Sequence, residues 1–180
     1  MDLMQEIIAR AKADKQRIVL PEGTEERTLK AADRLLADGV ADIILIGNPA
    51  EISSLAANYG LNHIGQATIV DPKNHEKKAA YADLLFQLRQ KKGMTPEKAA
   101  VMVEDPLFLA CLMIKAGDAD GEIAGAQNTT GNVLRPALQI IKTRVEPETA
   151  EEIRAAGLAG IQIDENFKRY YPFGHLASQS

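Results

Sequence analysis

Small polar residues that run into a helical pattern suggest an anion-binding site within residues 121–142. Thr129, Thr130 and Gly131 end a turn of small residues, and the apolar residues after them recur at helical spacing. A helix that starts here would point free backbone N–H groups at a ligand, and the threonine hydroxyls beside them suit a phosphate oxygen. Arg135 lies one to two turns further on, where its guanidinium could add a bidentate contact. An ordinary capped connection between strand and helix has the same composition, so the pattern alone leaves both interpretations open.

Arg89 is the second candidate for binding an anion. It lies near the end of a predicted helix, next to Lys91, Lys92 and Gly93. Several cations beside a flexible turn could bind an anionic ligand, although cations also favour the C-terminus of any helix. Arg89 and Arg135 both lie beside glycine-containing turns, so we expect their guanidinium groups to face one cleft at the carboxyl ends of the strands.

The elements that must position these residues alternate between strand and helix along the chain. Short apolar runs predict strands, and amphipathic stretches with capping residues predict the helices between them. This alternation favours a parallel sheet of three or four strands covered on both faces, which is the α/β class. The predicted strands are Arg17–Leu20, Asp42–Gly47, Ala67–Val70 and Gly121–Gly125, and the predicted helices include Glu25–Ala37 with Thr24 as its N-cap, Asn74–Lys92, Thr95–Val103 and Pro106–Lys115.

Composition predicts a folded, acidic protein. The chain has 180 residues, of which 46% are hydrophobic and 26% are charged, which suffices for one domain with a full core. Its formal charge of -4 gives no basic stripe, so we expect no nucleic-acid partner. No apolar run approaches the length of a membrane span, and residues 1–15 are too charged for a signal peptide, so we expect no membrane partner.

Cys111 is the only cysteine in the sequence, and it lies in the apolar run LFLACLMI. It cannot form an internal disulfide, and we expect it to pack as a small hydrophobic residue inside a buried helix. A free thiol of this kind fits a reducing compartment, so the expected location is the cytoplasm.

Four separated blocks of the sequence resemble the bacterial phosphate acetyltransferase (phosphotransacetylase) family. They occur in the family's order, which makes the resemblance specific, and the resemblance runs from about residue 1 to residue 143. The resemblance implies the three-layer parallel-sheet α/β fold of the isocitrate and isopropylmalate dehydrogenases, here incomplete because proteins of the family are longer. The blocks are IVLPEGTEERTLKAA from Ile18, LRQKKGMTPEKA from Leu88, DPLFLACLMIKAGDADGEIAGA from Asp105 and AGAQNTTGNVLRPALQIIKT from Ala124.

The resemblance implies acetyl transfer between acetyl phosphate and coenzyme A, with coenzyme A as a substrate and with no metal or other cofactor. Arg89 and Arg135 match the family's ligand arginines. The family's catalytic aspartate and serine lie in blocks that do not occur before Ser180, so the catalytic residues are unknown and we expect half a site that is silent by itself. The alternatives are an enzyme similar to phosphate butyryltransferases or to the acyltransferase-like tail of malic enzymes, or a folded fragment that binds phosphate or coenzyme A without turnover. A homodimer is compatible with each of them.

Residues 144–180 depart from the family's pattern. The string GIQIDENFKRYYPFGHLASQ resembles the segment before the transpeptidase domain of type 2 penicillin-binding proteins. The transpeptidase motifs SxxK, SxN and KTG are absent, so this segment carries no penicillin-binding chemistry. We therefore expect a partial phosphate acetyltransferase-like domain at residues 1–143 and a short α+β tail of different origin at residues 144–180, in a chimeric or truncated chain.

Overall fold

A computed structural model describes residues 3–141 of the chain. The chain divides into two compact units, Met1–Thr143 and Arg144–Ser180, and the described residues all belong to the first. The short α+β tail expected at residues 144–180 lies outside the described residues.

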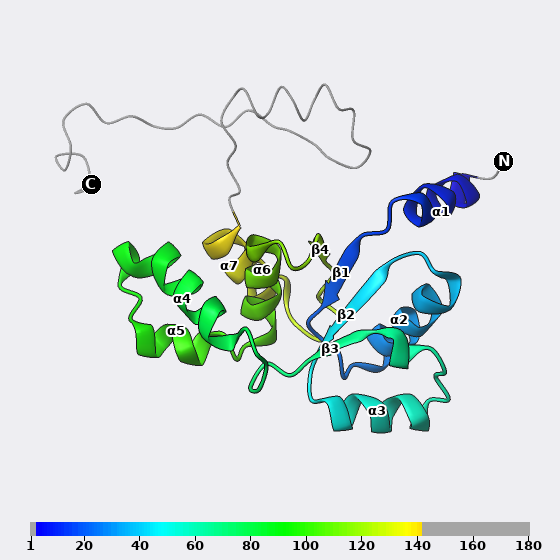
Figure 1. The fold of residues 1–180 in the computed structure, drawn as a ribbon, viewed down its shortest axis with the longest axis horizontal. Helices are drawn as coiled ribbons and strands as arrows, with labels where there is room; N and C mark the ends of the chain where they lie inside the picture. Colours follow the sequence, from blue (N-terminus) through cyan, green and yellow to red (C-terminus); the bar gives the residue numbers. More distant parts are fainter. Residues whose placement is uncertain (1–2, 142–180) are drawn as a thin grey trace. The chain divides into compact units, whose positions relative to one another are not determined.

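Four parallel strands form the sheet, in the order β3-β2-β1-β4. In the register, Val19 of β1 lies between Ile44 of β2 and Glu122 of β4. The predicted parallel α/β sheet is therefore confirmed (Figure 1). The strands are β1 (Arg17–Leu20), β2 (Asp42–Ile46), β3 (Thr68–Val70) and β4 (Gly121–Glu122).

Helices cover both faces of this sheet and make the fold three-layered (Figure 1). Two short 3₁₀ turns, Ile64–Gln66 and Gln90–Lys92, complete the described elements. The helices are α1 (Leu3–Ala13), α2 (Glu26–Asp38), α3 (Pro49–Asn58), α4 (Lys78–Arg89), α5 (Pro96–Met102), α6 (Pro106–Ala116) and α7 (Thr130–Ile140).

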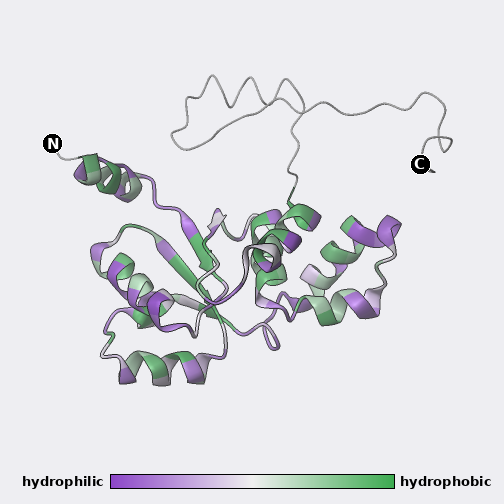
Figure 2. Cartoon of the chain, turned by 180° about the vertical axis from the view of Figure 1, so that it is seen from behind, coloured by the Kyte–Doolittle hydropathy of each residue, from purple (hydrophilic) through white to green (hydrophobic). Residues whose placement is uncertain are grey.

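Alternate side chains of the central strands enter two separate hydrophobic cores, because successive residues of a strand point to opposite faces. Ile44 and Ile46 pack against the side formed by α4, α5 and α6, whereas Ile43 and Leu45 pack against α2 and α3. Figure 2 shows the hydrophobic colour along β1 and β2. Helix α6 is buried from Leu107 to Met113, which confirms the expectation that the run around Cys111 is a core helix.

Local capping signals fix most helix starts. Asn48 accepts hydrogen bonds from the N–H groups at the start of α3, and Asp105 does the same for α6. The predicted cap of α2 was one residue early. Glu25, not Thr24, is the N-cap, because its carboxylate accepts the N–H of Thr28 at 2.8 Å.

The long helix predicted for Asn74–Lys92 is shorter in the structure, where α4 begins at Lys78. Asp71 holds the chain before it in a turn: its carboxylate accepts the N–H of Lys73 at 2.9 Å and its carbonyl accepts the N–H of Asn74 at 3.2 Å. An aspartate side chain that bonds nearby backbone in this way competes with helix formation.

Strand β4 is also shorter than the predicted Gly121–Gly125. The N–H of Ile123 still reaches the carbonyl of Val19 at 3.1 Å, but the chain then turns away from the sheet. Gly125 has a φ of 108°, a conformation that favours glycine, and the next residues are held by a side chain rather than by a strand.

Candidate functional site

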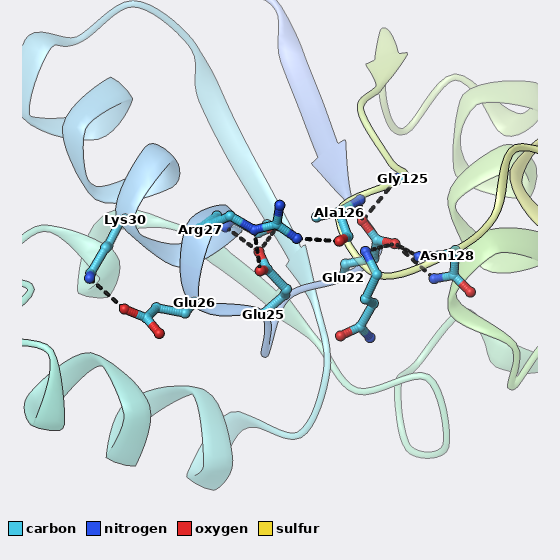
Figure 3. A network of polar contacts seen from close by, with 10 residues as sticks. Glu22, Glu25, Glu26, Arg27, Lys30, Gly125, Ala126 and Asn128 are labelled. Atoms are coloured by element: carbon cyan, nitrogen blue, oxygen red, sulfur yellow. Dashed lines mark hydrogen bonds and ion pairs between the residues drawn. The ribbon is translucent and has the colours of Figure 1, made fainter.

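Glu22 lies at the centre of a polar network at the carboxyl edge of the sheet (Figure 3). It follows β1 directly after Pro21, and it is only 3% exposed. Its carboxylate accepts the backbone N–H groups of four successive residues and one side-chain amide. These donors are Gly125 at 2.9 Å, Ala126 at 2.6 Å, Gln127 at 3.0 Å, and Asn128 at 2.8 Å from both its backbone and its side chain.

This contact corrects part of the sequence-based interpretation. The turn that leads to Thr129 does bind an anion, but for the N–H groups of residues 125–128 the anion is a carboxylate of the chain itself. Sequence reasoning missed Glu22 because its donors are more than 100 residues away. The available signal was a carboxylate between proline and glycine immediately after a buried strand.

Gly23 allows Glu22 to reach this position, because the backbone of β2 lies directly against it. A Cβ atom at Gly23 would come within 2.5 Å of the carbonyl oxygen of Ile46, and the N–H of Gly23 donates to the same oxygen at 3.2 Å. Arg27 also contacts the loop of residues 125–128. Its guanidinium pairs with Glu25 at 2.7 Å and donates to the carbonyl of Ala126.

Glu22, which is buried, and Glu122, which is half-buried on β4, have opposite electrostatic environments. Burial raises the pKa of Glu22, but the donors of the loop more than offset it, so the net pKa lies below the ordinary carboxyl value. Burial raises the pKa of Glu122, and the nearby charge of Glu22 raises it further. The thiol of Cys111 donates to one Glu122 oxygen at 3.3 Å, and the other oxygen is buried without a partner among residues 3–141.

Helix α7 begins immediately after this loop. Thr129 is its N-cap, and the Thr129 hydroxyl accepts the N–H of Asn132 at 3.4 Å. Thr130 and Gly131 form the first helical positions and are exposed, and their backbone N–H groups have no acceptor among residues 3–141. The donors that remain available for the expected anion are therefore these two N–H groups and the hydroxyls of Thr129 and Thr130. Each hydroxyl can still donate its own proton.

The candidate arginines are both unpaired within the described part of the chain. Arg135 is exposed on α7, and Arg89 is half-buried at the end of α4; the guanidinium group of neither makes an ion pair or a hydrogen bond among residues 3–141. Arg89 lines a cavity of ≈ 590 Å³ together with Lys92 and Gln139. Arg135 is not among the residues that line this cavity.

Gln139 lines the same cavity as Arg89 and lies on the same helix as Arg135. It lies one turn after Arg135, and residues four apart share a helix face, so the cavity wall belongs to the same face as Arg135. A single cleft for Arg89 and Arg135 stays a prediction.

Residues 3–141 contain no group of three or more His, Cys, Asp or Glu side chains that could hold a metal ion. None of the helices within that range is long and apolar enough to cross a membrane.

The fold and the site define a class of protein: a three-layer α/β domain in which the first N–H groups of α7 and the guanidinium groups of Arg89 and Arg135 have no partner among residues 3–141. The chain belongs to the phosphate acetyl/butaryl transferase family, whose model matches residues 2–158.

Relatives and solved structures agree with this assignment. Phosphate acetyltransferase of Acetivibrio thermocellus is 48% identical over 143 residues, which are 79% of this chain and 42% of that protein. Phosphate acetyltransferase of Corynebacterium glutamicum is 36% identical over 171 residues, 95% of this chain and 49% of that protein. EutD phosphotransacetylase from Staphylococcus aureus superposes with a TM-score of 0.72 at 33% identity, over 80% of this chain and 44% of that one. A phosphotransacetylase from Streptococcus pyogenes gives 0.74 at 30% identity over the same shares.

The chain thus spans less than half of the length of these relatives. The family match and the alignment with the Corynebacterium glutamicum protein both run past residue 143.

Proposed function

We propose that this chain supplies the phosphate-binding half of an acyltransferase that exchanges an acetyl group between acetyl phosphate and coenzyme A. In this reaction the thiolate of coenzyme A attacks the acetyl carbonyl, and inorganic phosphate leaves. The reaction needs a base for the thiol, donors for the developing oxyanion and cations for the leaving phosphate. Coenzyme A is a substrate, and the proposal includes no metal or other cofactor.

The open start of α7 carries this proposal. Thr130 and Gly131 offer two backbone N–H groups without acceptors among residues 3–141, at the positive end of a helix. Arg135 follows on the same helix, and Arg89 lies in a cavity whose wall includes α7. Two arginines and a helix N-terminus suit a dianionic phosphate or a phosphate group of coenzyme A.

Asp118 and Asp120, in the turn before β4, are poor candidates for the base that the thiol of coenzyme A needs. Asp118 accepts the Tyr81 hydroxyl at 2.7 Å and pairs with Lys77, and Asp120 pairs with Arg17 at 2.7 Å. The Lys77 ammonium and the Arg17 guanidinium hold the pKa values of these carboxyls below the ordinary range, which makes them poor bases. The 180-residue chain alone should therefore form no acetyl coenzyme A above a buffer blank.

Calorimetric titration with inorganic phosphate tests the proposal. Arg135→Ala should weaken binding by about 1.5 to 3 kcal/mol, since a charge-assisted hydrogen bond is lost, which is about ten- to a hundredfold in affinity. Arg34→Ala is the matched control, because Arg34 is also an exposed helical arginine and its one ion pair, to Asp38, is long at 3.9 Å. Equal affinities for the wild type and both variants would refute the proposed site.

The acyl group is a second question, since the family's description covers both acetyl and butyryl transfer. Acetyl is favoured because the relatives named above are phosphate acetyltransferases and phosphotransacetylases. The test is a protein that joins this chain to the second half of a relative. Comparing its transfer rates with acetyl phosphate and with butyryl phosphate would show which acyl group it prefers. A fragment that binds ligand without turnover is the remaining alternative, and the same joined protein would then stay inactive.

The proposal places the protein in the cytoplasm, with homodimer formation as a further proposal and without nucleic-acid or membrane partners. We also propose that residues 1–143 form a partial transferase domain and that the tail of residues 144–180 has a different origin. The local run KRYYPFG supports this chimera, whereas the two matches that run past residue 143 weigh against it. Sequencing the gene through the codons on both sides of residue 143 and past residue 180 would decide.

A further inference from the structure

We infer that Glu22 is the positioning residue of the phosphate site: its buried carboxylate is a built-in anion that shapes the loop of residues 125–128 and so places the start of α7. This inference deepens the proposed function and rests on it. Glu22 touches no proposed ligand group itself, so its role is to hold the groups that do.

The loop depends on Glu22 for almost all of its hydrogen bonds. Within the described residues, the backbone N–H groups of residues 125–128 all donate to the Glu22 carboxylate, and none donates to another backbone group. The Arg27 guanidinium adds one contact, to the carbonyl of Ala126. Four successive N–H groups converge on one point only in a curled backbone, and such a curl is stable when an anion occupies it.

The loop in turn sets the position of the helix start. Asn128, the last residue held by Glu22, immediately precedes Thr129, the N-cap of α7. Only the cap residue therefore separates the Glu22 network from the open N–H group of Thr130. A displaced loop would displace the cap and the first turn of α7 with it.

The Glu22 charge also has an effect of the opposite sign, because a carboxylate repels a phosphate. Five donors surround this carboxylate, and they compensate much of its charge. The nearby charged groups are Arg27 and Glu25 on the α2 side and the half-buried Glu122 on β4. With this compensation the positioning effect should exceed the repulsion, so removal of Glu22 should weaken phosphate binding rather than strengthen it.

The test combines removal of the carboxylate with its replacement from solution. In Glu22→Ala, amide hydrogen exchange at residues 125–128 should be at least about tenfold faster than in the wild type. Phosphate affinity should fall by about tenfold or more. Added acetate can occupy the space that the Glu22 carboxylate leaves, so it should restore both the hydrogen-exchange protection of residues 125–128 and the affinity for phosphate. A purely structural defect would not be repaired by acetate.

Matched variants separate the charge from the space that it fills. Glu22→Gln keeps the volume, but its amide N–H₂ faces backbone donors, so it should behave as Glu22→Ala does and acetate should not rescue it. Glu26→Gln is the control, since Glu26 is an exposed glutamate on α2 that pairs with Lys30. It should leave exchange and affinity unchanged.

The possible outcomes separate the positioning role of Glu22 from the proposed phosphate-binding function. Unchanged loop exchange in Glu22→Ala, or faster exchange with equal or higher phosphate affinity, overturns the positioning role. A wild type that binds no phosphate overturns the proposed function and, with it, the positioning role, while the exchange data still report whether Glu22 holds the loop. If Glu22→Ala does not fold, Asn128→Ala removes one of the five donors and should give a smaller change in the same direction; no change there would also overturn the role.

Discussion

Replacing Gly23 with alanine should destabilise the protein because β2 leaves no space for a side chain at this position. The added Cβ would come within 2.5 Å of the Ile46 carbonyl oxygen, and real contacts of this kind stay beyond 3.0 Å, so backbone atoms must separate by at least 0.5 Å. Forced overpacking of this kind costs about 1–3 kcal/mol. The N–H of Gly23 also donates to that oxygen at 3.2 Å, and weakening this bond adds about 0.5–1 kcal/mol.

The expected loss of unfolding free energy in Gly23→Ala is therefore about 1.5–4 kcal/mol. Urea denaturation followed by circular dichroism measures it, and the midpoint of thermal unfolding should fall by about 5–15 °C. Gly65→Ala is the matched control, since a Cβ at Gly65 meets nothing within 4 Å and its φ is not positive. The control should be neutral or slightly stabilising. Equal stability of Gly23→Ala and wild type would refute the argument from close approach.

Two further predictions concern titratable groups. Cys111 is fully buried, and burial together with the neighbouring Glu122 raises the pKa of its thiol, so a thiol reagent should label it slowly in the native protein and rapidly in denaturant; rapid native labelling would contradict the buried position. The folded-state pKa of Glu22 is lowered, so its stabilising effect is present above the ordinary carboxyl pKa and is lost as pH falls through the lowered value. Unfolding free energy should therefore decrease from about pH 5 to pH 3, less steeply in Glu22→Gln than in the wild type. Asp120, whose pKa is about 2, adds to the slope equally in both proteins, so identical slopes would refute the assignment to Glu22.

Helix ends were largely predictable because their signals are local. Asn48 before Pro49, and Asp105 before Pro106, each combine a capping side chain with a proline that tolerates the first turn. Gly117 ends α6 in the left-handed conformation, as expected of a glycine after a helix. The sheet followed from the alternation of such helices with short apolar strands.

The missed features depend on contacts between distant or competing groups. Thr24 and Glu25 are both adequate caps, and the choice of Glu25 follows from its additional pairing with Arg27. The position of Glu22 between proline and glycine after a buried strand could not show which groups its carboxylate would meet, because its donors become neighbours only when β4 pairs with β1.

The candidate site could be predicted only in outline. The helix N-terminus at Thr130 and Gly131 was evident from residue types, but the occupation of the preceding N–H groups was not. Arg89 and Arg135 were singled out mainly by resemblance to a family, since an exposed arginine on a helix has the same local sequence whether or not it binds a ligand. Whether they face one cleft depends on packing between α4 and α7, which no local pattern encodes.

The contact between Glu22 and the loop of residues 125–128 also limits the order in which parts of the chain can fold during synthesis. The partners are 103 to 106 residues apart, so the ribosome must add every element from α2 to β4 before the first donor exists. At usual rates of translation this interval lasts about 5–20 s. Throughout it, the charged Glu22 carboxylate lies two residues beyond the end of β1 and must stay hydrated. The carboxyl edge of the nascent domain should therefore close last, when residues 125–128 leave the exit tunnel.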